Sequence, residues 1–315
     1  MLTYIAQRFL WLPPLLVGAT ALVFFIMNAA PGDPIVIMFG SAAWQMPPDQ
    51  IQLIREKWGL NDPIYVRYGR YLWNLLHGDL GLSIVSKRPV SELLAERIPN
   101  TIQLAIASTL LAALIGIPAG IVAAVRQYTL FDYSVTLLAF IGISVPNFWL
   151  GLMLMWLFGL TLGWLPIAGM GHNGILDSLR HLILPAVTLG TGMTASLARL
   201  TRSGMLEVLR EEYIKTAYSK GLAERTVIYK HAFRNAAISV VTILGLQFAG
   251  LLGGAVIVET MFAWPGVGRL VINAIWRRDY FVVLGGVLML TFVYAMTNLL
   301  VDLSYALLDP RIRYD

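Results

Sequence analysis

The sequence predicts an all-α integral membrane protein with six transmembrane helices. Of its 315 residues, 57% are hydrophobic and only 13% are charged, and the mean hydropathy is +0.70. A water-soluble fold cannot bury so large an apolar fraction. An uncharged run of about 20 residues crosses a hydrocarbon core of about 30 Å. Six runs without Asp, Glu, Lys or Arg meet or approach that length: residues 9–30, 102–125, 133–166, 182–198, 236–258 and 281–301.

Three of these runs have features of their own. The first follows Arg8 as a signal peptide would, but it is longer than the apolar core of roughly 7–15 residues that such peptides carry. We therefore expect it to remain as the first helix. The third run exceeds one span and carries Pro146, which can kink a helix. The fourth is short, so its helix is expected to continue past Arg199.

The distribution of Lys and Arg predicts that both termini are cytoplasmic. Basic residues favour cytoplasmic loops, and long translocated segments are discounted in this count. With the N-terminus inside, the cytoplasmic set is Arg8, Arg126, Arg199, Arg202, Arg210, Lys215, Lys220, Arg225, Lys230, Arg234, Arg311 and Arg313. The opposite short loops hold only Arg180, Arg269, Arg277 and Arg278.

Two connections between the predicted spans are long. Residues 31–101 lie outside and mix aromatic residues, charges and turn sequences such as Asn61-Asp62-Pro63, so they are expected to form a small ordered cap. Residues 199–235 lie inside and are rich in basic and acidic side chains, which cost roughly 2.5–3.5 kcal/mol each at the bilayer centre. This inner segment must therefore stay outside the membrane.

The inner segment predicts a helix, a glycine turn and a second helix. Residues 205–220 are strong helix formers without proline. Gly221 suits the left-handed turn that ends a helix, and a further helix can start near Ala223 and run into the fifth span. Physical reasoning leaves two roles open. The pair could lie on anionic headgroups, or it could dock a partner closely through Ala217 and Gly221, with Tyr213 and Lys220 as anchors.

Sequence motifs favour the docking role. Residues 212–222 read EYIKTAYSKGL and residues 231–236 read HAFRNA. Together they resemble the coupling loop of type I ABC importer permeases, and more narrowly the peptide and nickel branch of these binding-protein-dependent inner membrane components. The family's general pattern is Glu-Ala-Ala, three residues, then Gly. Lys215 and Thr216 depart from it, although the Thr-Ala form is usual in the peptide branch, whereas Ala217 and Gly221 match.

The resemblance extends along nearly the whole chain. The other matching motifs are PGDP at 31–34, GDLG at 78–81, RIPNT at 97–101, FAWPGVGR at 262–269, RDY at 278–280 and DPRIR at 309–313. It implies the type I importer fold, with the first helix and external cap in residues 1–96, the transmembrane domain in 97–308 with its coupling loop at 199–235, and a cytoplasmic tail at 309–315. The implied ATPase-docking residues are Glu212, Tyr213, Thr216, Ala217, Lys220 and Gly221.

The resemblance also implies the partners. These are a second, homologous permease that completes a heterodimer, two cytoplasmic ATPase subunits and an external solute-binding protein. The chain has no phosphate-binding loop of the form Gly-x4-Gly-Lys-Ser/Thr, so ATP is expected to bind only to the ATPase subunits and no cofactor to this one. The excess of basic residues is explained by the cytoplasmic loops of a membrane protein. No run of basic residues interleaved with aromatic residues indicates binding to nucleic acid.

Other candidate sites have ordinary explanations. The chain has no cysteine, and His77, His172, His181 and His231 lack metal-ligand spacing. Asp302, near the inner end of the sixth span, can reach water or an arginine. Small residues four apart allow close helix contact in the second and fifth spans, where the pairs are Gly116 with Gly120, Ala249 with Gly253 and Gly250 with Gly254. In the fifth span they could also face the partner permease or the pathway.

The function expected from these motifs is a non-catalytic permease subunit that forms half of a pathway for dipeptides and oligopeptides. Nickel, a nickel chelate or glutathione is the alternative solute, because the same motifs serve both branches. A secondary transporter would need ion-binding polar groups at mid-membrane. A membrane-embedded enzyme would need a nucleophile, a metal site or an acid/base pair, and the sequence presents neither pattern.

Overall fold

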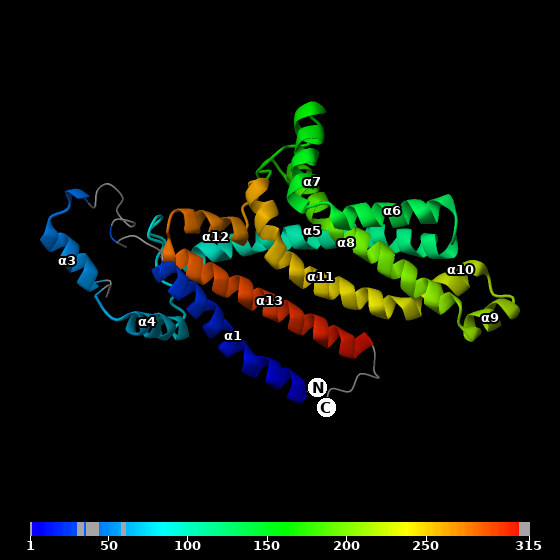
Figure 1. Ribbon diagram of the computed structural model, residues 1–315, viewed down its shortest axis with the longest axis horizontal. Helices are drawn as coiled ribbons and strands as arrows, with labels where there is room; N and C mark the ends of the chain where they lie inside the picture. The colour runs from blue at the N-terminus through cyan, green and yellow to red at the C-terminus, as the bar shows by residue number, and fades with distance from the viewer. Residues whose placement is uncertain (1, 30–34, 36–43, 58–60, 309–315) are drawn as a thin grey trace. The chain divides into compact units, whose positions relative to one another are not determined.

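The computed structural model describes residues 2–29, 35, 44–57 and 61–308. The motifs at 31–34 and 309–313, the tail at 309–315, and Arg311 and Arg313 lie outside the described residues. The described part of the chain is helical, with one isolated bridge between Leu82 and Pro89 instead of a sheet (Figure 1).

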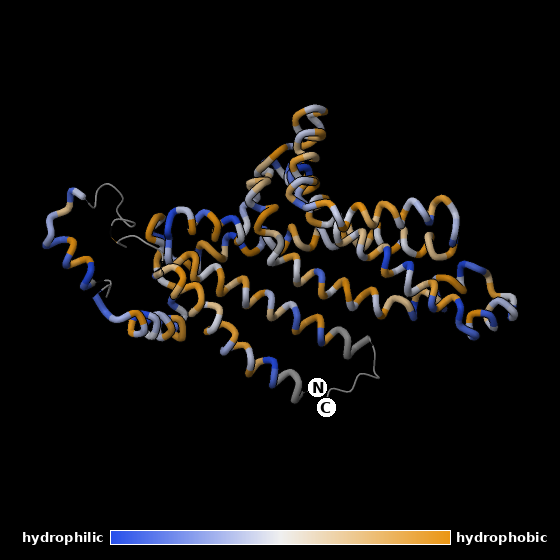
Figure 2. The backbone as a smooth tube through the Cα atoms, in the orientation of Figure 1, coloured by the Kyte–Doolittle hydropathy of each residue, from blue (hydrophilic) through white to orange (hydrophobic). Residues whose placement is uncertain are grey.

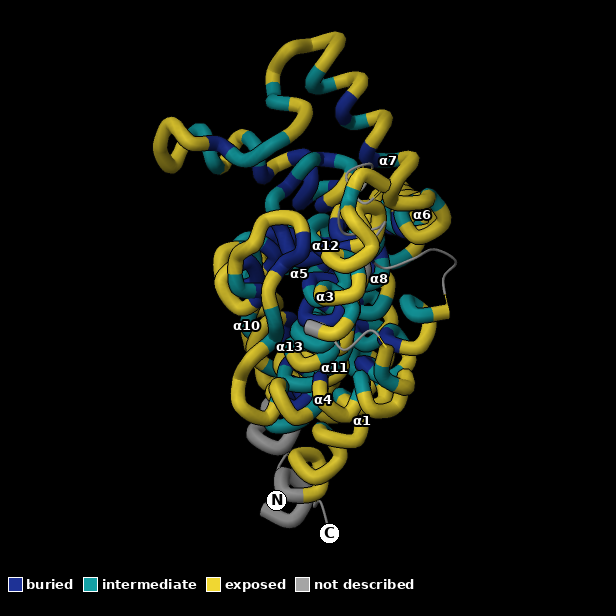
Figure 3. The backbone as a smooth tube through the Cα atoms, turned by 90° about the vertical axis from the view of Figure 1, so that its left-hand side faces the viewer, coloured by how far each residue is buried: buried dark blue, intermediate teal, exposed yellow. Residues whose placement is uncertain are grey.

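Among the described residues, five helices are long and apolar enough to cross a membrane. They are α1 (Leu2–Ala29), α5 (Val90–Val125), α8 (Ile175–Leu209), α11 (Arg234–Met261) and α13 (Tyr280–Leu308). Their cores match the first, second, fourth, fifth and sixth predicted runs, and α8 continues past Arg199 as expected. Large apolar side chains such as Leu10, Trp11 and Leu22 are exposed on α1, which suits contact with lipid. Figure 3 colours much of the described part of α1 as exposed.

The third predicted run forms two helices that meet at a sharp bend beside Pro146. Helices α6 (Leu130–Ser144) and α7 (Asn147–Leu154), which continues as the π-helical turn η2 (Met155–Thr161), meet at 104°. Val145 is extended because Pro146 disfavours the helical conformation in the residue before it. The prediction of six spans depends on whether this bent pair crosses as one, and it stays a prediction.

The chain divides into two compact units. One unit comprises Thr101–Trp264 and the chain from Met296 onward, and the other comprises Leu2–Asn100 and Pro265–Ala295. In the first unit, α8 packs against α6, α7 and α11, and its cores contain fully buried side chains such as Leu197 and Trp264. The expected close contact at Gly116 and Gly120 is confirmed. A Cβ on Gly120 would lie 2.5 Å from the Ala198 carbonyl oxygen, so α5 and α8 touch backbone to backbone.

The glycines of the fifth predicted span behave differently. In α11, Ala249 is buried, whereas a Cβ added at Gly250 or Gly253 would meet nothing within 4 Å. Gly254 is described only as helical backbone. Within the described chain, therefore, Gly250 and Gly253 do not mediate a close helix contact.

The second unit contains the helices of the predicted cap, α3 (Pro48–Lys57) and α4 (Ile64–Leu76), together with α12 (Val267–Trp276). Helix α4 contacts α1 through an aromatic cluster that includes Phe24, Tyr68 and Tyr71. Burial raises the pKa of the Tyr71 hydroxyl above its usual range, so this group stays protonated.

The Arg-Asp-Tyr motif explains part of this second unit. The buried Asp279 carboxylate accepts hydrogen bonds from Ser83 Oγ (2.5 Å) and from the backbone N–H groups of Ile84 (3.0 Å) and Val85 (3.3 Å). The adjacent Tyr280 hydroxyl accepts from Asn28 Nδ2 at 2.6 Å. The motif therefore fixes the turn that precedes α5 and the end of α1 to the start of α13.

Candidate functional site

The predicted docking segment joins α8 to α11. It contains α9 (Glu212–Ser219), a tight turn, and α10 (Glu224–Thr226), which continues through the π-helical turn η3 (Val227–Phe233) into α11. Figure 1 shows α9 and α10 beyond the ends of α8 and α11, and Figure 2 shows hydrophilic residues gathered there. The expected second helix from Ala223 into the fifth span is confirmed.

The predicted continuous helix over residues 205–220 is wrong. Helix α8 ends at Leu209, and Glu211 adopts an extended conformation before α9 begins. Residues 205–220 have high helix propensity throughout, but tertiary packing overrides it. The break changes the direction of the chain, so that the short α9 can turn its apolar side chains back onto α5 and α8.

Gly221 makes the predicted left-handed turn. Its φ is +75°, its N–H donates to the Tyr218 carbonyl at 2.9 Å, and the Leu222 N–H donates to the Ala217 carbonyl at 3.4 Å. These two bonds form a Schellman motif, which satisfies the last carbonyls of α9. Gly221 is exposed, and a Cβ at this position would meet nothing within 4 Å.

One face of α9 is buried in the chain's own core. Ile214 is 1% exposed and Ala217 is 7% exposed. Both belong to an apolar group, called here the α9 cluster, whose other buried members are Ile121, Ala124, Met205, Val227, Ile228, Ala232 and Ala236. Ala217 was expected to let the turn approach a partner, but the structure places it inward. Its small side chain lets α9 lie close to η3, in a cluster to which α5 and α8 also contribute.

The opposite face of α9 is open. Glu212, Thr216 and Lys220 are all exposed, and Glu212 pairs with Lys215 at 2.6 Å where both are well solvated. A pair so exposed contributes little to stability. The Tyr213 hydroxyl accepts a hydrogen bond from Asn235 Nδ2 at 2.7 Å, which links α9 to α11. Tyr213 therefore has a partner within the chain as well as an exposed ring edge.

Sequence reasoning missed two exposed side chains beside the turn. Tyr218 is 45% exposed and Leu222 is 39% exposed, next to Gly221. Both side chains are therefore available for contact with a partner. The sequence could have predicted the exposure of Tyr218. Ile214 and Ala217 are three residues apart and lie on one face of the helix, and Tyr218 lies outside that face.

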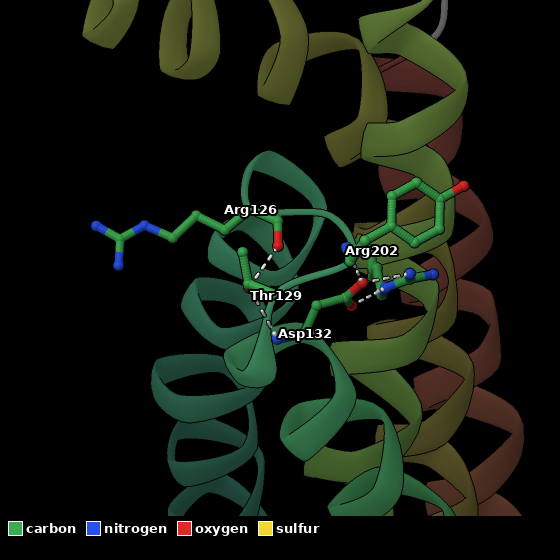
Figure 4. Close-up of polar contacts among 5 residues, drawn as sticks. Arg126, Thr129, Asp132 and Arg202 are labelled. Atoms are coloured by element: carbon green, nitrogen blue, oxygen red, sulfur yellow. Dashed lines mark hydrogen bonds and ion pairs between the residues drawn. The ribbon is translucent and has the colours of Figure 1, made fainter.

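An ion pair between a buried carboxylate and a partly exposed arginine lies in the same unit, at the start of α6. Asp132 is 1% exposed, and its carboxylate accepts from Arg202 Nε at 2.5 Å and from the second guanidinium nitrogen at 2.8 Å (Figure 4). The Tyr128 N–H donates to the same carboxylate at 3.0 Å. Thr129 caps α6 by accepting from the Asp132 N–H, and its hydroxyl donates to the Arg126 carbonyl at 2.6 Å. Sequence analysis had considered Arg202 only for its charge.

No substrate site stands out among the described residues. No three His, Asp or Glu side chains there gather around a position that could hold a metal ion. An open hollow of about 570 Å³ lies at the α6–α7 bend and is lined mainly by apolar side chains such as Phe140, Pro146 and Trp149.

Comparison with known proteins identifies relatives over the whole chain. Residues 116–314 match the family described as "binding-protein-dependent transport system inner membrane component", and residues 1–105 match the N-terminal family of the same systems. The oligopeptide transport system permease protein AppB of Bacillus subtilis is 46% identical over 319 residues, with all of both chains covered. The dipeptide transport system permease protein DppB of Escherichia coli K12 is 41% identical, with 100% of this chain and 99% of the relative covered.

A solved structure agrees with the fold. A chain of the methionine ABC transporter MetNI, in an inward-facing conformation, is 18% identical and superposes with a TM-score of 0.57. The match covers 70% of this chain and 97% of that chain. At this identity the likeness concerns the fold alone. It confirms the predicted all-α membrane fold of the type I importer kind.

Proposed function

Because this chain belongs to the family of binding-protein-dependent transport system inner membrane components, we propose that it forms half of an import pathway for short peptides. Membership makes the chain a multi-pass, non-catalytic subunit of the inner membrane that works with a binding protein and with ATPase subunits. The peptide assignment, the arrangement of partners and the docking site are the proposal.

One observation carries the peptide assignment. Relatives that match over the full chain at 40–46% identity are named permeases for oligopeptides, dipeptides or di- and tripeptides. The motifs shared with nickel importers did not separate the two solutes, and these relatives favour peptides.

The proposed assembly places both termini in the cytoplasm, as the Lys and Arg count requires. A second, homologous permease completes a heterodimeric pathway, and two ATPase subunits bind beneath it. This chain contacts one of them through the open face of α9 and the turn at Gly221. The exposure of Tyr218, Lys220 and Leu222 around that turn supports this surface. No cofactor is assigned to this subunit, and ATP stays with the ATPase subunits.

In this proposal, ATP binding closes the ATPase pair and pulls on α9. The energy comes from contacts that differ between the open and closed ATPase dimers. Ile214 and Ala217 hold α9 against α5 and α8, so the pull reaches the membrane helices through packed side chains. The bundle then alternates between inward and outward openings.

The test of the solute is uptake by a strain that lacks this subunit. Complementation with the chain should restore uptake of labelled dipeptides and oligopeptides, and nickel accumulation should not change. Restored nickel uptake without peptide uptake would show that nickel is the solute and would leave the assignment as a permease unchanged. No restoration of either by a stably expressed, assembled chain would contradict the proposal.

The test of the docking surface uses Leu222→Asp, which places a charge on the exposed side of the turn. We expect loss of co-purifying ATPase with the membrane domain still folded. The control is Lys87→Asp in the predicted external cap, where φ is +59°, a conformation that Asp tolerates well. Equal ATPase recovery in both variants would show that the docking surface lies elsewhere.

A further inference from the structure

The strongest polar contact that the transport proposal leaves unexplained is the pair of Asp132 and Arg202. The two residues are 70 positions apart, on the first turn of α6 and near the end of α8. Figure 4 shows the carboxylate directed at the guanidinium group, with both oxygens engaged. Two parallel bonds of this kind fix orientation as well as distance.

Burial of the Asp132 carboxylate costs free energy, so the pair is expected to have a role that offsets this cost. A carboxylate that is almost fully buried loses its hydration, and the loss is offset only where the geometry is good and the remaining lone pairs are satisfied. Here the Tyr128 N–H supplies a third bond, and Tyr128 holds a φ of +64° in the α5–α6 turn. A buried pair is weak evidence for net stability, and its best-attested use is to fix one arrangement.

The pair stands beside two other contacts on α8. A Cβ at Gly120 of α5 would lie 2.6 Å from Thr201 Cβ and 3.0 Å from the Arg202 backbone nitrogen. Met205, one helical turn after Arg202, is fully buried in the α9 cluster with Ile214. The end of α8 is thus joined to α5 by a glycine contact, to α6 by the ion pair, and to α9 by apolar packing.

We propose that Asp132 and Arg202 are positioning residues that make α6 move together with α8 and α9 during the transport cycle. The proposal rests on the docking role of α9 proposed above. A pull on α9 reaches α8 through the α9 cluster, and the bidentate pair then carries it to α6 and onward to the α6–α7 bend. Helices α6 and α8 also pack against each other, with Gly142 beside Thr191 and Ala195, so the pair adds a polar link at the start of α6. Without the pair, the end of α8 can follow α9 while the start of α6 lags behind.

The first experiment measures coupling in the complete transporter reconstituted in liposomes. The variants are Asp132→Asn, Arg202→Lys, and the double variant Asp132→Asn with Arg202→Gln, which leaves no unpaired buried charge. We expect assembly and ATP hydrolysis to be retained while peptide transported per ATP falls by roughly 2- to 30-fold. The double variant should lose no more than the worse single variant, because both changes break one link.

The matched control is the exposed pair of Arg70 and Asp62, which has a similar N–O distance of 2.6 Å. Asp62→Asn should leave peptide transported per ATP unchanged. An unchanged ratio in the Asp132 and Arg202 variants would overturn the proposal. Loss of assembly in the double variant as well as in the single variants would also overturn it, because the pair would then be needed only for folding.

The second experiment reports on motion, which a merely structural pair would not affect in the same way. The chain has no cysteine, so spin labels can be placed at Leu137→Cys on the exposed face of α6 and at Glu207→Cys near the end of α8. In the otherwise native chain, the distance between the labels should be the same with and without ATP. In Asp132→Asn it should broaden or shift when ATP binds.

A change of distance with ATP in the otherwise native chain would show that α6 and α8 move separately, and the proposal would fail. Failure of the transport proposal looks different, because the native complex itself would then import no peptide or retain no ATPase. The two outcomes can therefore be told apart in the same preparation.

Discussion

Replacing Ala217 with glutamate tests the inward orientation of α9. The new carboxylate would lie among the buried apolar side chains of the α9 cluster. An unpaired charge buried there costs several kcal/mol. Helix α9 has only 8 residues and two buried side chains, Ile214 and Ala217. Releasing it forfeits roughly 1.5–3 kcal/mol for the isoleucine and about 0.8 kcal/mol for the alanine methyl.

Undocking α9 therefore costs less than burying the charge, so the variant should release α9 and leave the membrane helices packed. The loss of about 2–4 kcal/mol corresponds to a rise of roughly 30- to 700-fold in the opening of α9. Hydrogen–deuterium exchange of the α9 amides measures this opening directly. Transport should fail because α9 is undocked, and not because a partner is repelled.

Thr216→Glu is the matched control, since it adds the same group at the preceding residue, on the exposed face. Exchange in α9 should then stay near the native rate. Native exchange in Ala217→Glu, together with fast exchange in Thr216→Glu, would mean that α9 faces the other way. The assignment of its buried and open faces would then be refuted.

Three further predictions follow from the structure. Gly120→Ala should lower the thermal unfolding temperature in detergent, because overpacking against the α8 backbone costs about 1–3 kcal/mol, whereas Gly250→Ala meets open space and should not. Asp279→Asn replaces the oxygen that accepts from Ser83 Oγ and the Val85 N–H by an NH2 donor, so it should cost about 1–3 kcal/mol, seen as faster proteolysis of residues 82–89. Single cysteines at Lys220 and Lys87 should react with an impermeant thiol reagent from the cytoplasmic and external sides respectively; reversed labelling would contradict the orientation.

The sequence determined those features that depend on local composition and backbone geometry. Uncharged runs located the helices that can cross a membrane, because hydrocarbon excludes both charge and unpaired backbone groups. Gly221 marked a left-handed turn, because glycine adopts that conformation at little cost. The motif order identified the family, which the full-length relatives confirm.

Only the tertiary structure shows which face of each helix is buried against other helices and which is exposed. The same string of helix formers breaks at Glu211 and turns Ala217 inward, because packing against α5 and α8 outweighs small differences in helix propensity. Pro146 predicted a kink in the third run. The angle of 104° between α6 and α7 depends on how each of the two helices packs against α8. Asp132 pairs with Arg202, which lies 70 residues further along the chain, and no local sequence pattern predicts this pair. Such contacts arise only once the helices have fixed positions, because side chains distant in sequence meet through the arrangement of whole elements.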